Sequence, residues 1–150
     1  MNVKYPEGSM ARYRAREKKL KKSVRSHALG IKPEHEIQDE IRYMLALNGH
    51  EVYRANVGLM KTEDGKRGMS TGLPAGFPDL FGSRKGDGKT FYIEVKNKRG
   101  KRRPKQIAFA KDHANKPVIY GVARSAEEAL NIVENGINDP VDHMHPKDIE

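Results

Sequence analysis

The chain has 150 residues, 36% hydrophobic and 33% charged, which suits one domain with a buried core and leaves no room for a second. It contains no cysteine, and this excludes disulfides, thiolate zinc sites and cysteine nucleophiles. Because no apolar run approaches the roughly 18 to 20 residues of a membrane span, we expect no membrane partner and a cytoplasmic location.

The net charge of +9 is concentrated at the N-terminus. Residues 1–30 hold nine Lys or Arg against two Glu, or +7, and the other 120 residues carry only +2. Apolar residues here form no stripe, so we do not expect a helix that is stable alone. We predict a flexible basic arm that orders on a phosphate backbone, the alternative being a solvated tail. Its predicted nucleic-acid contacts are Arg12, Arg14, Arg16, Lys18, Lys19, Lys21, Lys22 and Arg25.

Helical periodicity predicts a first helix over residues 33–48. Glu36 and Glu40 lie one turn apart beside its apolar face, where an acid could lean over the edge of a sheet. The alternative is that both are solvated surface acids. The apolar residues that define the face are Ile37, Ile41, Met44 and Leu45.

Residues 51–56 alternate as a short strand. The next segment, 57–77, is rich in glycine and has no sustained periodicity, so we predict an irregular loop. A loop of this length is usually either functional or disordered.

Residues 78–96 predict a β-hairpin, because two apolar runs flank a Gly86-Asp87-Gly88 turn. If the hairpin is symmetric about Gly86 and Asp87, Asp79 lies opposite Glu94, with Cβ atoms roughly 4.5–5.5 Å apart. Lys96 emerges on the same face, two residues beyond Glu94. Two carboxylates so close repel one another, and we expect a divalent cation to relieve the repulsion.

After the hairpin, a basic turn leads to Pro104, which suits the first position of a second helix. The apolar run 118–123 predicts a strand buried on both faces, and Ser125 and Glu128 form a capping box for a third helix that ends near residue 135. Residues 137–150 are predicted to be a solvated tail. The resulting order is α-β-β-β-α-β-α, an α/β fold with a mixed central sheet of about four strands and flanking helices.

Pro78-Asp79, a gap of fourteen residues and Glu94-Val95-Lys96 resemble the signature of the PD-(D/E)XK nuclease superfamily. Residues 76–80, 92–96 and 105–106 resemble its VRR-NUC (virus-type replication-repair nuclease) branch. The similarity extends from about residue 34 to about residue 133. It implies a restriction-endonuclease-like core, with a nuclease domain over 31–136 between the arm (1–30) and the tail (137–150).

The resemblance also implies hydrolysis of phosphodiester bonds with Mg²⁺ or Mn²⁺ and no small-molecule cofactor. The implied metal ligands are Asp79, Glu94, the Val95 carbonyl and Glu36, with Glu40 a rival to Glu36. Lys96 and Gln106 complete the implied catalytic set, and Lys105 is a rival to Gln106.

The residues Arg54-x-Asn56-x-Gly58 resemble an element that precedes the glycine-rich loop in the family, and the resemblance implies that Asn56 contacts nucleic acid near the site. The other contacts expected beside the site are the cations of the basic turn and the helix start: Lys98, Arg99, Lys101, Arg102, Arg103 and Lys105. The family resemblance favours a DNA endonuclease for branched or junction DNA, acting as a homodimer, in the host cytoplasm if the protein is viral. A non-catalytic DNA- or RNA-binding protein and an RNA-directed nuclease remain alternatives.

Overall fold

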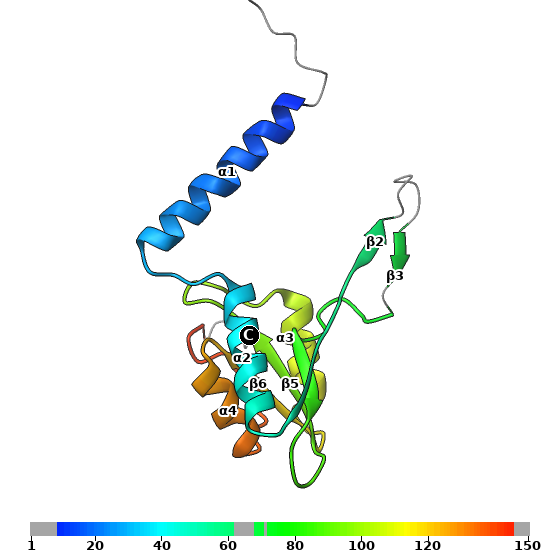
Figure 1. Cartoon of the computed structure of the whole chain (residues 1–150). Helices are drawn as coiled ribbons and strands as arrows, with labels where there is room; N and C mark the ends of the chain where they lie inside the picture. The colour runs from blue at the N-terminus through cyan, green and yellow to red at the C-terminus, as the bar shows by residue number, and fades with distance from the viewer. Residues whose placement is uncertain (1–8, 62–67, 71, 146–150) are drawn as a thin grey trace, which may run out of the picture. The chain divides into compact units, whose positions relative to one another are not determined.

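The computed structural model describes residues 9–61, 68–70 and 72–145, and the chain divides into two units, Met1–Pro33 and Glu34–Glu150. In the first unit, α1 spans Ser9–Ala28 (Figure 1). We expected no helix that is stable alone over this stretch, and the structure shows it as one helix of 20 residues. The stretch consists mostly of residues with a high intrinsic helix propensity, namely Ala, Arg, Lys, Glu and Leu. This propensity favours a helix even though the helix has no apolar stripe. All eight cations predicted to bind nucleic acid are exposed on this helix.

The second unit has the predicted order of elements, and this confirms the α/β fold. α2 ends at Asn48-Gly49 as the sequence predicts, since Gly49 has a positive φ. The elements of this unit, apart from one small hairpin, are α2 (Glu34–Leu47), β1 (Glu51–Arg54), β4 (Leu80–Ser83), β5 (Thr90–Val95), α3 (Pro104–His113), β6 (Ile119–Ala123) and α4 (Ala126–Glu134).

Four strands form a mixed sheet in the order β1-β4-β5-β6. The first three are antiparallel neighbours, and β6 pairs parallel to β5 after the crossover through α3. In the β4–β5 hairpin Leu80 pairs with Ile93 and Phe81 with Tyr92, which is the register predicted from the symmetric turn. The next pair along this register is Asp79 and Glu94.

A second hairpin lies within the segment predicted to be irregular. β2 (Leu59–Lys61) and β3 (Gly68–Ser70) pair antiparallel, with Met60 opposite Met69. The prediction of an irregular loop is thus wrong for these residues. Residues 62–67 and 71 of the same loop lie outside the described part of the chain.

The main core lies between the sheet and α2 with α4 (Figure 1). Alternate residues of β5, namely Phe91, Ile93 and Val95, face these helices and are fully buried. Alternation sends Tyr92 and Glu94 to the opposite face. There Phe77 and Phe109 pack edge-on against Tyr92, and Phe109 attaches α3 to the sheet.

Residues 137–145 are not the solvated tail that we predicted, and residues 146–150 of that predicted tail lie outside the described part of the chain. The backbone N–H of Tyr120 donates to Ile137 O, and Asp139 N–H donates to Tyr120 O, so this segment runs along the outer edge of β6. Asp142 is only 2% exposed. Open backbone groups on an edge strand, together with a buried partner for Asp142, explain why a polar segment packs here.

Among the described residues, no helix combines the length and apolar character that crossing a lipid bilayer requires.

Candidate active site

Two carboxylates meet where β4 begins and β5 ends. Glu94 is fully buried on β5, and Asp79, immediately before β4, accepts a hydrogen bond from Val95 N–H through Oδ2 at 2.8 Å. Burial, and secondly the negative charge of Asp79, raise the pKa of Glu94 to about 8. The metal-free carboxyl of Glu94 therefore holds a proton at neutral pH.

Lys96 lies on the same face of the sheet as Glu94, as the alternation along the strand predicts. Its Nζ donates to Glu94 Oε1 at 2.6 Å and to the carbonyl of Val95 at 3.1 Å. The side chain is only 7% exposed. The three residues of the sequence motif thus converge, with the cation held against one of the acids.

Gln106 approaches the same carboxylate from α3. Its Oε1 accepts from Arg103 N–H at 2.7 Å, and its Nε2 donates to Glu94 Oε1 at 2.5 Å. The first bond caps the N-terminus of α3, whose first residue is Pro104. Because the amide oxygen is engaged by the helix cap, the NH₂ group is directed at Glu94.

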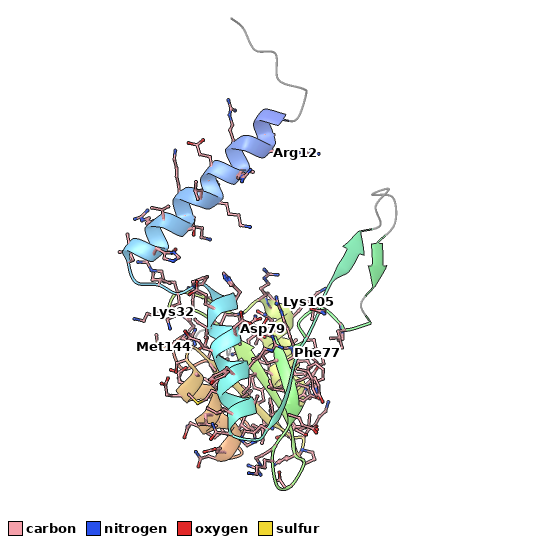
Figure 2. The ribbon with its side chains drawn as sticks, viewed as in Figure 1. Arg12, Lys32, Phe77, Asp79, Lys105 and Met144 are labelled. Carbon is pink, nitrogen blue, oxygen red and sulfur yellow. The ribbon has the colours of Figure 1, made fainter. Side chains whose placement is uncertain are left out.

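Asp79, Lys96 and Gln106 line an open pocket of about 730 Å³, and the buried Glu94 lies behind them. Figure 2 shows Asp79, Phe77 and Lys105, all three lining residues, at one end of the sheet. The wall combines small and apolar residues with charged ones. The lining residues are Glu34, Ala55, Val57, Gly58, Ala75, Gly76, Phe77, Asp79, Lys96, Arg103, Pro104, Lys105 and Gln106.

The acid that α2 presents to the pocket is Glu34. Glu36 and Glu40 are both exposed, and neither lines the pocket, so the structure does not support the expected placement of Glu36. Glu34 precedes the buried Ile37 by three residues, which puts it on the buried face, whereas Glu36 is turned about 100° away. Extending the apolar stripe one step backwards would have identified Glu34.

Most of the nucleic-acid contacts predicted beside the site are exposed. Arg103 and Lys105 line the pocket and are exposed, and Lys98, Arg99 and Lys101 are exposed nearby in the chain.

Two of the predicted contacts do not fit this pattern. Asn56 is exposed but does not line the pocket, although Ala55 and Val57 on either side of it do. Arg102 is only 5% exposed, and its Nη1 donates to the hydroxyl of Tyr120 at 3.3 Å. A guanidinium buried in this way is not available to a phosphate, so the prediction for Arg102 is wrong.

The donor set fits a hard divalent cation. Glu94 Oε2 is buried, and no hydrogen-bond donor of the described residues reaches it. This oxygen lies beside a second carboxylate, an arrangement that requires either a proton or a metal ion. The described residues contain no group of three or more His, Asp or Glu arranged for a metal. Mg²⁺ nevertheless often binds through one or two carboxylates and keeps several waters.

Comparison of the chain with protein-family models, with curated proteins and with solved structures found no match. Function is therefore inferred from the motif residues and from the geometry of the site.

Proposed function

We propose that this protein is a metal-dependent DNA nuclease of the PD-(D/E)XK type, in the VRR-NUC branch. The observation that carries the proposal is Glu94, a buried acid with an unsatisfied oxygen, beside Asp79 and Lys96 on the wall of an open pocket. A carboxyl this costly to bury serves no evident packing purpose, because an apolar residue of similar volume would fill the same space more favourably. The arrangement instead suits the binding of a divalent cation.

In this proposal Asp79 and Glu94, with the carbonyl of Val95, hold Mg²⁺ or Mn²⁺. A cation held there would supply an activated water and would offset the charge that grows on the scissile phosphate. Glu94 gives up its proton when the cation binds, which makes binding stronger as the pH rises towards 8.

The protein's own groups position the reaction. Lys96 keeps Glu94 oriented and brings a positive charge to the pocket, where it stabilises the phosphorane. Gln106 donates a second hydrogen bond to Glu94 Oε1 and so helps to orient the carboxyl group. Arg103 and Lys105, exposed on the pocket wall, contact the phosphates of the strand to be cut.

The substrate in this proposal is DNA, cleaved internally at branches or junctions during replication, recombination or repair. The exposed cations of α1 add sequence-independent phosphate contacts. Paired cuts at a junction require two active sites, and this favours a homodimer.

The test is a cleavage assay with Mg²⁺ or Mn²⁺ on duplex, flap, splayed and four-way DNA. We expect Asp79→Ala and Glu94→Ala to abolish cleavage and to retain DNA binding. Asp87→Ala is the matched control, because Asp87 is an acid of the same hairpin that pairs with Arg84 in the exposed turn. Near wild-type cleavage by both active-site variants would refute the assignment.

A non-catalytic nucleic-acid-binding protein is the second candidate, and the basic surface of α1 favours it equally. Tight binding of DNA or RNA with no cleavage of any substrate under either metal would select this alternative.

A further inference from the structure

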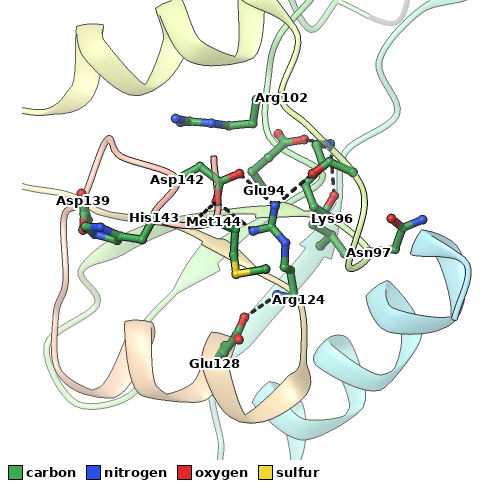
Figure 3. A network of polar contacts seen from close by, with 12 residues as sticks. Glu94, Lys96, Asn97, Arg102, Arg124, Glu128, Asp139, Asp142, His143 and Met144 are labelled. Carbon is green, nitrogen blue, oxygen red and sulfur yellow. Dashed lines mark hydrogen bonds and ion pairs between the residues drawn. The ribbon is translucent and has the colours of Figure 1, made fainter. Parts of the chain in front are cut away.

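A buried ion pair joins the end of β6 to the C-terminal segment. Arg124 directs Nη1 at Asp142 Oδ1 and Nη2 at Asp142 Oδ2, both at 2.9 Å, and the two side chains are 8% and 2% exposed (Figure 3). Burial opposes ionisation of Asp142, but the hydrogen bonds and charge of Arg124 lower its pKa below the ordinary value. The pair is therefore ionised at neutral pH and has the parallel geometry that makes guanidinium–carboxylate contacts strong.

The same guanidinium also holds the turn that follows Lys96. Arg124 Nη2 donates to the carbonyl of Gly100 at 2.9 Å. Figure 3 shows the side chain of Arg124 reaching between Asp142 and this turn. Asp142 thus fixes a guanidinium that in turn fixes one peptide of the basic turn.

That peptide packs directly on the candidate active site. A Cβ atom at Gly100 would lie 2.6 Å from Glu34 Oε1, the movable end of that side chain, and 3.1 Å from Lys96 Cδ, so the Gly100 backbone lies directly against both side chains. The backbone at Gly100 therefore forms a wall against the stem of Lys96, whose Nζ holds Glu94. Displacing this wall would free the lysine stem to move.

We infer that Arg124 and Asp142 are positioning residues, which act through Gly100 to hold Lys96 against Glu94. The inference rests on the proposed nuclease function for its catalytic consequence, but the mechanical link is independent of that function. A buried ion pair contributes little net stability compared with apolar residues, so a role in fixing geometry accounts for its presence. The C-terminal segment would accordingly belong to the catalytic unit.

Asp142→Asn tests this link with an almost isosteric change, and Arg124→Lys tests it a second time. Lysine keeps the charge, but a single ammonium cannot reproduce the planar fork that reaches both Asp142 and Gly100. We expect hydrogen exchange at the turn amides of Arg99 and Gly100, which donate to Asn97, to accelerate at least tenfold in both variants. We expect kcat for DNA cleavage to fall about tenfold with KM unchanged, as for a group that acts only in the transition state.

Asn138→Ala is the matched control. Asn138 anchors the same C-terminal segment, but its Nδ2 donates to the carbonyls of His113, Ala114 and Lys116 after α3 rather than to the basic turn. It should lower the melting temperature and leave both kcat and exchange at the turn unchanged.

Wild-type exchange at the turn in Asp142→Asn and Arg124→Lys would overturn the inference. An equal loss of kcat in Asn138→Ala would also overturn it, since the effect would then reflect general stability. If the wild-type protein cleaves no DNA, the proposed function fails, and the exchange measurement alone decides whether the link exists.

Discussion

Replacing Glu94 by glutamine should remove a large pH dependence of stability from the metal-free protein. The amide oxygen still accepts from Lys96 and Gln106, as Glu94 Oε1 does now. The amide nitrogen takes the place of Oε2 and donates towards Asp79. The substitution therefore imitates the protonated carboxyl of Glu94 and removes a group that titrates.

The magnitude follows from the shift in the pKa of Glu94, from 4.5 to about 8. Because the folded carboxyl holds its proton more tightly than the unfolded one, stability is full below about pH 4.5 and is lost as the pH rises through 8. At about 1.4 kcal/mol per pKa unit, the wild-type free energy of unfolding falls by roughly 4 kcal/mol over this range. Glu94→Gln should not show this fall, and at pH 8 its advantage in melting temperature over wild type should be on the order of 10 °C.

The assay is urea or thermal unfolding of both proteins at several pH values from 4.5 to 8 in the presence of a chelator. Asp87→Asn is the control, since Asp87 is exposed and its pKa is lowered by the hydrogen bond from Arg84, so it does not titrate in this range. Adding Mg²⁺ at pH 8 should stabilise the wild type and not Glu94→Gln. The reasoning is refuted if Glu94→Gln keeps the wild-type pH dependence, or if the wild type shows none.

Three further predictions concern the acids and the arm. Asp79→Asn should lower the pKa of Glu94, because it removes a like charge, and should reduce the pH dependence of unfolding while abolishing cleavage. Glu34→Gln should weaken Mg²⁺ binding, measured by calorimetry, whereas the matched variant Glu36→Gln should not; equal effects would contradict the placement of Glu34 on the pocket. Deleting residues 1–26 should make the slope of log affinity against log salt shallower by about 0.9 for each phosphate contact that the deletion removes, with kcat unchanged; an unchanged slope would show that the arm makes no phosphate contacts.

The hairpin was predictable because its signals are local. Gly86 and Gly88 adopt the positive φ that the turn requires, and strict alternation along β5 then places Glu94 and Lys96 on one face. Both steps involve residues close together in the sequence. The helix that carries Glu34 was predicted equally well, but the position of its acid depended on choosing the correct stripe on the helix.

The burial of Arg102 was not predictable in the same way. It stands in a run of cations that is typical of a solvated turn, and its partner Tyr120 is 18 residues away. Asp142, which pairs with Arg124 across another 18 residues, likewise has no local pattern that marks it as buried. Such long-range polar pairs depend on the packed fold, and hydrophobic periodicity carries no information about them.

The segment along β6 has a consequence for any attempt to shorten the protein. Ending the chain at residue 136, where periodicity ends, would uncover the backbone N–H and carbonyl of Tyr120. A bare strand edge is a template on which another chain can add its own strand. The polar C-terminal segment thus protects the edge of β6 from pairing with another chain. A protein truncated at residue 136 would be prone to aggregate even though it keeps every residue that lines the candidate site.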